Sequence, residues 1–139
     1  MLLLCINLNN FSSIVSAFVR EVMKKWPFTI KQGDDSGWTP LHIAAHMGYW
    51  SCVSLLLENG NSPAYVRNRE GLSALHIAAK EGNYGVMDIL MTACPEIYEL
   101  LDNKGRNALH AAAESGRWEA FELFKAGPEF GSLINEQDE

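Results

Sequence analysis

The chain has 139 residues, of which 47% are hydrophobic and 20% are charged, and this composition is typical of one folded globular domain rather than a disordered chain. Eleven Lys and Arg residues against 17 Asp and Glu give a net charge of −6, which argues against a nucleic-acid-binding module, because such modules normally present a basic face. Three cysteines without a C-x-x-C pair predict no disulfide framework and favour a reducing compartment, so we expect a cytoplasmic protein.

The N-terminal part of the chain predicts one amphipathic helix. Apolar residues recur at helical spacing over residues 10–26, and Pro27 then ends the pattern. We expect this helix to pack on the segment that contains Trp38. The side chains expected to be buried there are Phe11, Ile14, Phe18 and Val22.

The same helix has an alternative interpretation as a membrane-surface helix. Arg20, Lys24 and Lys25 lie on its polar side, as in helices that bind lipid headgroups. Glu21 and three serines dilute that charge, so we favour a structural helix that covers the end of the domain.

Three stretches after residue 34 align without a gap. They read Gly37-Trp-Thr-Pro-Leu-His-Ile-Ala-Ala45, Gly71-Leu-Ser-Ala-Leu-His-Ile-Ala-Ala79 and Gly105-Arg-Asn-Ala-Leu-His-Ala-Ala-Ala113. Their histidines are 34 residues apart. Self-similarity at a fixed period of this length indicates a repeat protein.

Residue types within each repeat predict the same order of local structure. An Asx side chain holds a turn, and a glycine at the tip supplies a positive φ. A Thr, Ser or Asn then caps a first helix, which a second glycine ends. These positions are Asp34, Gly37, Thr39 and Gly48; Asn68, Gly71, Ser73 and Gly82; and Asp102, Gly105, Asn107 and Gly116. The pattern predicts an all-α solenoid with helix pairs at about 39–58, 73–92 and 107–125.

This period and the T-P-L-H-x-A core resemble the ankyrin repeat. The resemblance implies helix-turn-helix repeats joined by projecting hairpin-like loops. The expected organisation is a degenerate repeat with its helix at 1–33, ankyrin repeats at 34–67, 68–101 and 102–134, and the start of a further, truncated repeat at 135–139.

Sequence segments that extend beyond the repeat core show a narrower resemblance. The segments concerned are Gly37 to Gly48, Glu70 to Gly82, Cys94-Pro95 with Leu101 to His110, and Leu133-Ile-Asn-Glu-Gln-Asp138. They are similar to plant membrane-anchored ankyrin-repeat proteins of the accelerated-cell-death type. That resemblance implies that this sequence is a repeat-region fragment, that C-terminal transmembrane helices follow it, and that the protein acts in stress or defence signalling.

The histidines favour a structural role over catalysis or metal binding. His42, His76 and His110 occupy the same place in each repeat, and we expect each to hydrogen-bond the backbone of the next hairpin. His42 and His46 have a spacing that zinc sites use, but no third ligand lies nearby in sequence. No phosphate-binding loop or catalytic triad is recognisable. We therefore expect no enzyme, no cofactor, no metal and no small-molecule substrate.

Binding information is expected where the repeats differ, because the shared positions build the scaffold. The varying positions flank each tip glycine and precede each helix-ending glycine. They are Asp35, Ser36, Trp38, His46, Met47, Arg69, Glu70, Leu72, Lys80, Glu81, Asn103, Lys104, Arg106, Glu114 and Ser115. We expect them to bind a protein partner on the concave face, with Trp38 as the leading hot-spot candidate. A Trp38 that merely covers the adjacent hairpin is the open alternative.

The C-terminal end predicts an incompletely covered surface. Phe121 and Phe124 lie on the last second helix, and no further complete repeat follows them. Exposed apolar surface of this kind promotes association, so we expect this end to fray or to dock another surface.

Overall fold

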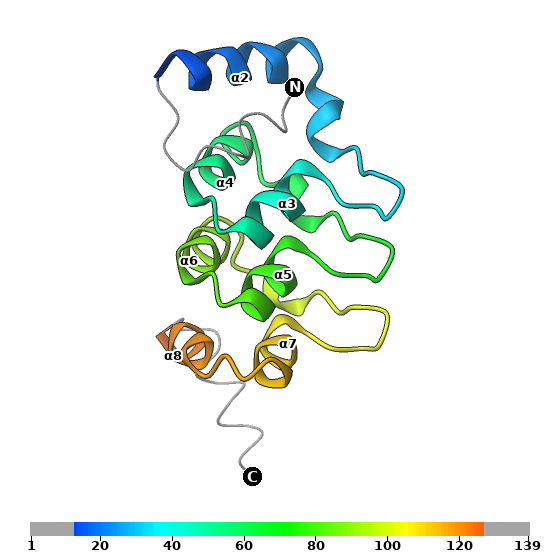
Figure 1. The fold of residues 1–139 in the computed structure, drawn as a ribbon, viewed down its shortest axis with the longest axis vertical. Helices are drawn as coiled ribbons and strands as arrows, with labels where there is room; N and C mark the ends of the chain where they lie inside the picture. The colour runs from blue at the N-terminus through cyan, green and yellow to red at the C-terminus, as the bar shows by residue number, and fades with distance from the viewer. Residues whose placement is uncertain (1–12, 127–139) are drawn as a thin grey trace.

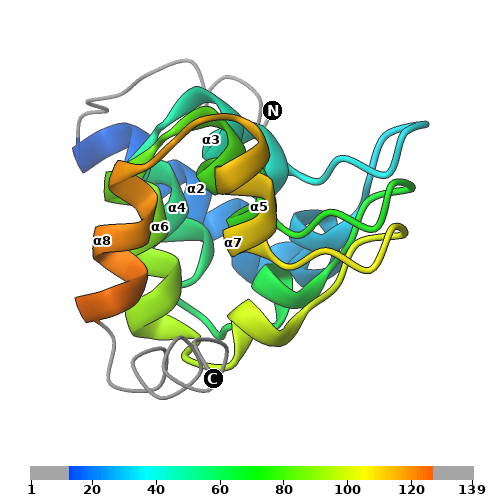
Figure 2. The same ribbon diagram turned by 90° about the horizontal axis from the view of Figure 1, so that it is seen from below.

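The computed structural model describes residues 13–126, with side chains over 17–125 (Figure 1). Its regular elements are α-helices and short 3-10 helices, and residues 13–126 contain no strand. The helices stack in pairs along the long axis, and the loops between pairs project from one side (Figures 1 and 2). The expected all-α solenoid is therefore confirmed.

Three helix pairs form the stack, and their bounds agree with the ranges expected from the sequence to within two residues. The pairs are α3 (Pro40–Met47) with α4 (Trp50–Leu56), α5 (Ala74–Glu81) with α6 (Tyr84–Ala93), and α7 (Ala108–Glu114) with α8 (Glu119–Ala126). Short 3-10 helices, η2 (Ser62–Tyr65) and η3 (Ile97–Glu99), follow α4 and α6. Before the first pair come α2 (Ser13–Lys25) and η1 (Pro27–Lys31).

Local side-chain chemistry sets where each first helix begins and ends. The hydroxyl of Ser73 accepts a hydrogen bond from the N–H of His76, and the His76 ring accepts one from the N–H of Ser73. This reciprocal cap satisfies two N–H groups that a helix N-terminus leaves without intrahelical partners. The helix ends at Gly82, whose φ of 72° lies in the left-handed region that favours glycine. Helices α3 and α7 carry equivalent reciprocal caps.

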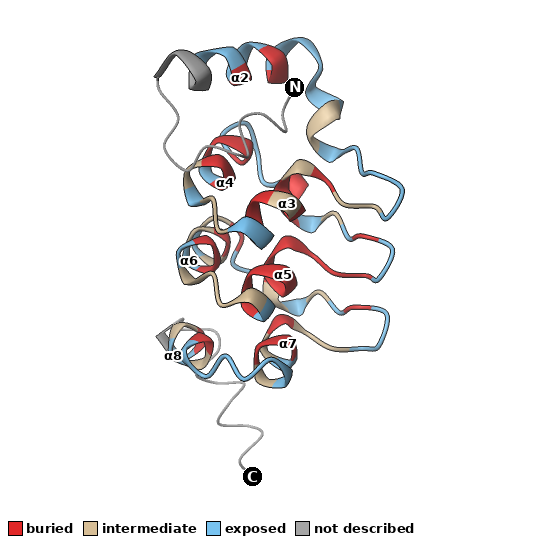
Figure 3. Cartoon of the chain, viewed as in Figure 1, coloured by how far each residue is buried: buried red, intermediate tan, exposed pale blue. Residues whose placement is uncertain are grey.

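Small side chains allow the first helices to pack closely. Ala44, Ala45, Ala78, Ala79 and Ala112 are each 0% exposed where α3, α5 and α7 stack. Buried residues line the inner sides of both helix columns in Figure 3. Larger aliphatic side chains fill the space between the columns, so one continuous core runs through the three pairs.

Helix α2 covers the N-terminal end of the stack with a different face from the one expected. Val19 and Met23 are each 2% exposed and Val22 is 9% exposed, whereas Phe18 is 48% exposed. The expectation that Phe18 is buried is wrong, because the inward face follows the i, i+4 pair of Val19 and Met23 and leaves Phe18 to one side. Phe11 and the side chain of Ile14 lie outside the described residues.

The last helix also differs from expectation. Phe124 and Ala120 are both 0% exposed, because their i, i+4 spacing places them on the inner face of α8. The expectation that Phe124 has an uncovered side is therefore wrong. Phe121 is half-buried and stacks on Trp118, which is 67% exposed. The apolar surface at this end thus comes mainly from Trp118.

Candidate functional site

Three loops project side by side from the stack (Figures 1 and 2). We call them finger 1 (residues 32–39), finger 2 (66–73) and finger 3 (100–107). In finger 2 the Asn68 N–H donates to the carbonyl of Leu72 at 3.0 Å, and the Asn68 side-chain oxygen accepts from the N–H groups of Glu70 and Leu72 at 2.9 Å each. Asp34 and Asp102 hold fingers 1 and 3 in the same way. The expected Asx turns are confirmed.

Neighbouring fingers are joined by backbone hydrogen bonds. The N–H of Arg69 donates to the carbonyl of Ser36 at 3.1 Å, and the N–H of Asn103 donates to that of Glu70 at 3.0 Å. The Asn103 side chain adds a bond to the carbonyl of Arg69 at 2.7 Å. These bonds fix the relative position of tip residues from successive repeats, so the tips form one surface.

Buried histidines join each first helix to the next finger. Nε2 of His42 lies 3.0 Å from the carbonyl oxygen of Leu72, and Nε2 of His76 lies 2.9 Å from that of Arg106. Nδ1 of each ring accepts the N–H of its own helix cap, so Nε2 carries the hydrogen and donates it. Burial lowers the pKa of both imidazoles, which favours this neutral form. The expected bond to the next hairpin is confirmed for His42 and His76.

His110 occupies the equivalent position in α7 but has different surroundings. Its ring is exposed and accepts the N–H of Asn107 at 3.2 Å. No fourth finger follows it within residues 13–126, so the carbonyl partner available to the other two histidines is absent there.

Most of the predicted binding residues are exposed. These are Asp35, Ser36, His46, Met47, Arg69, Glu70, Lys80, Asn103, Lys104, Glu114 and Ser115, while Glu81, Arg106 and Trp38 are half-buried. Leu72 is buried, at 8% exposed, so the expectation of an open position there is wrong. Its side chain packs against the core beneath the fingers.

Trp38 lies against α3 rather than standing free. Its ring centroid is 5.6 Å from that of His46 in an edge-on arrangement and 6.1 Å from that of His42. The side chain is packed against the core cluster. Trp38 therefore has a structural role whether or not a partner also touches it.

Charged residues on this surface fall into paired and unpaired groups. Arg106 binds Asp102 at 2.9 Å through two of its nitrogens and also binds Glu114. Burial alone would raise the pKa of Asp102, but hydrogen bonds from Arg106 and from the N–H of Lys104 outweigh it and hold that pKa below its ordinary value. Arg69 and Lys104 have no ion-pair partner among the side chains that the structure describes.

A cavity of about 350 Å³ lies between fingers 2 and 3. Its lining residues are Arg69, Glu70, Leu72, Asn103, Lys104 and Arg106. All six belong to the set predicted from sequence variation between repeats. The structure therefore brings this part of the predicted set together around one concave site.

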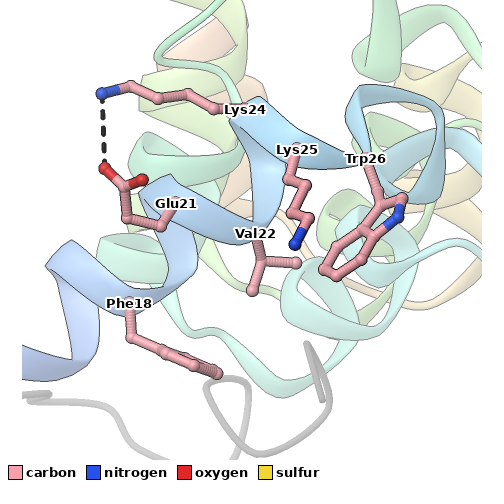
Figure 4. Close-up of a pocket in the computed structure, with 6 residues that line it drawn as sticks. All are labelled: Phe18, Glu21, Val22, Lys24, Lys25 and Trp26. Carbon is pink, nitrogen blue, oxygen red and sulfur yellow. Dashed lines mark hydrogen bonds and ion pairs between the residues drawn. The ribbon is translucent and has the colours of Figure 1, made fainter.

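A second concavity, of about 550 Å³, lies on α2 and was not predicted (Figure 4). Phe18, Val22 and Trp26 contribute its apolar surface, and Nζ of Lys25 lies 5.0 Å from the Trp26 ring centroid. The sequence signal that could have indicated this concavity is the mixture of aromatic and lysine residues around the end of α2. It was missed because helical periodicity predicted that Phe18 belongs to the core.

Two structural features expected of other protein classes are not seen in the described part of the chain. No helix within residues 13–126 is long and apolar enough to cross a bilayer. No group of three or more His, Cys, Asp or Glu side chains within that part could hold a metal ion.

Burial raises the pKa of the Cys94 thiol, which disfavours the reactive thiolate.

Comparison with known families agrees with the stacked fingers and helix pairs. A family model described as ankyrin repeats (3 copies) matches residues 61–132, and a model of a single ankyrin repeat matches residues 36–69. A comparison with curated proteins gives no match, so no relative supports the narrower resemblance to plant membrane-anchored proteins. Since the first match alone spans more than half of the sequence, the chain belongs to the ankyrin-repeat family.

Proposed function

We propose that this chain binds a protein partner through the three finger tips and the exposed C-terminal ends of α3, α5 and α7, without a catalytic role. Ankyrin repeats generally act as protein-interaction modules. The observation that carries the proposal is the segregation of residues on this array. Positions shared by the repeats are largely buried, whereas most of those that differ are exposed, either on the fingers or at the C-terminal ends of the first helices.

The fingers are also held in a fixed arrangement before any partner binds. Hydrogen bonds from Arg69 to Ser36 and from Asn103 to Glu70 connect the tips, and His42 and His76 connect the helices to the fingers. A surface that is already ordered loses little conformational entropy on binding. This favours recognition of a partner by direct docking on the array.

The experiment compares two charge-swap variants that leave the net charge unchanged. Asp35→Lys with Lys80→Glu alters finger 1 and the end of α5, and both residues are exposed. The matched control, Asp88→Lys with Lys125→Glu, alters exposed positions on α6 and α8, away from the fingers. Each purified variant is used for affinity capture with quantitative mass spectrometry, after its melting temperature has been shown to equal that of the parent.

We expect the parent and the control to capture the same proteins. The variant with Asp35→Lys and Lys80→Glu should capture about tenfold less of them, or even less, because mispaired charges at an interface cost several kcal/mol. Equal capture by all three proteins would overturn it.

A second candidate function is the regulatory part of a membrane-anchored plant ankyrin protein in stress or defence signalling. The motifs from Gly37 to Gly48 and from Glu70 to Gly82 favour it by resemblance. Reading the transcript beyond the codon for Glu139 tests it, because apolar helices in the same frame are required. We further propose a cytoplasmic location for the repeats, which fluorescence of a tagged full-length protein would check.

A further inference from the structure

We propose that the cavity between fingers 2 and 3 binds an acidic side chain, Asp or Glu, of a peptide segment in the protein partner. This inference rests on the proposed function and adds the chemistry of the contact. The cavity of about 350 Å³ is comparable to small ligand sites and is large enough for one side chain with part of its neighbour.

Two cations, one from each of the fingers that border the cavity, supply the attraction. Arg69 belongs to finger 2 and Lys104 to finger 3, and both line the cavity and are exposed. No carboxylate within residues 17–125 forms an ion pair with either of them. Both charges are therefore available to a partner, and an arriving carboxylate would not have to displace an internal one.

Arg106 contributes shape rather than net charge. Asp102 and Glu114 hold its guanidinium in place, and their two negative charges exceed its single positive charge. A guanidinium fixed in this way forms a wall with little remaining side-chain entropy to lose. The buried side chain of Leu72 adds an apolar part to the lining, which suits the methylene groups of an Asp or Glu.

The charge distribution among the fingers favours an acidic occupant at this place. Glu70 is the one carboxylate among the residues that line the cavity, against the two unpaired cations. Finger 1, by contrast, carries Asp34 and Asp35, and the whole chain has a net charge of −6. The two unpaired cations would attract a negative side chain and would give a bound segment a direction along the fingers.

Selection of random peptides of about 12 residues, displayed on phage, against the full chain tests this proposal. The cavity variant is Arg69→Glu with Lys104→Glu. The matched control, Lys24→Glu with Lys125→Glu, makes the same change in net charge on α2 and α8. The probe for affinity measurements is the most enriched peptide, labelled with a fluorophore, together with a version in which Asp and Glu are replaced by Asn and Gln.

We expect the selected peptides to be enriched in Asp or Glu. Their affinity should fall about tenfold or more in the cavity variant and in the amide version of the peptide, and about twofold or less in the control. The attraction should also weaken as salt is added. Thermal melts of both variants establish that the fold is retained.

Three results would overturn the proposal: peptides without acidic residues, unchanged affinity in the cavity variant, or no selected peptide at all. None of these results decides the proposed function. That function is tested by the capture experiment, whose variant changes Asp35 and Lys80 and leaves Arg69 and Lys104 unaltered.

Discussion

Replacing His76 by alanine tests whether the buried histidines hold successive repeats together. The imidazole is 1% exposed and joins the N–H of Ser73, at 3.2 Å from Nδ1, to the carbonyl of Arg106, at 2.9 Å from Nε2. His76→Ala removes both bonds, together with the 2.8 Å contact between Nδ1 and Oγ of Ser73, and leaves each backbone group without that partner. It also leaves a cavity where the ring was.

The cost follows from these losses. Each buried hydrogen bond contributes about 1 kcal/mol, and leaving its partner unsatisfied adds to that cost. The cavity adds about 1 to 2 kcal/mol. We therefore expect His76→Ala to lower the free energy of unfolding by at least about 3 kcal/mol, a large part of the stability of a small domain.

His110 provides the matched control within the same chain. Its ring is exposed, and within residues 17–125 the hydrogen bond that it forms is the one it accepts from the N–H of Asn107, the cap of α7. His110→Ala should cost less than about 1 kcal/mol, as expected for a surface position with one weak contact. Urea unfolding followed by circular dichroism at pH 7.5 measures both variants. Equal costs for the two substitutions would refute the role assigned to the inter-repeat bond.

Three other predictions concern pH, the fingers and the N-terminal helix. Burial lowers the pKa of His42 and His76 below the ordinary 6.5, so the unfolded chain binds more protons than the folded chain as the pH falls below that value. The free energy of unfolding should therefore be retained above pH 6.5 and should fall below it. Urea midpoints that stay constant down to pH 5.5 would contradict this. Gly71→Ala places a Cβ 2.6 Å from the N of Asn103 at a φ of +80°, whereas Gly105→Ala at a φ of +72° meets nothing within 4 Å. Gly105→Ala should therefore cost about 1 kcal/mol for its φ alone and Gly71→Ala at least about 1 kcal/mol more, with equal melting temperatures as the contrary result. Deleting residues 1–26 removes the buried face of α2 and should lower the melting temperature by about 10 °C and expose dye-binding surface; unchanged stability with loss of liposome binding would instead support a membrane-surface helix.

The sequence alone determined the local structure of the repeats. The 34-residue period marks the repeats, and within each repeat the helix caps depend on residues only a few positions apart, as at Ser73 and its equivalents. Gly48 and Gly82 end α3 and α5 as expected, whereas α7 has Ser115 as its C-cap, one residue before the expected Gly116. Such short-range chemistry acts in the same way whatever packs on it. The helix pairs and the all-α solenoid could therefore be predicted before any coordinates were available.

Tertiary packing decided what is covered and what is free. Phe18 and Phe124 have the same side chain, yet one is 48% exposed and the other 0%, because each helix turns a particular face toward its neighbour. Leu72 likewise differs from expectation, because its side chain packs against the core beneath the fingers. His110 is exposed, unlike its two equivalents, and no fourth finger lies beside it within residues 13–126. Periodicity marks an apolar face only to within a residue or so.

The candidate site illustrates the same division. Sequence variation between repeats identified Arg69 and Lys104 as surface positions, but not as walls of one cavity. The bond from the N–H of Asn103 to the carbonyl of Glu70 sets the register of fingers 2 and 3 and so brings these cations to a common site. Whether a surface charge is already neutralised, as for Arg106, or available, as for Lys104, depends on which carboxylate the fold places beside it, and only the tertiary structure fixes that neighbour.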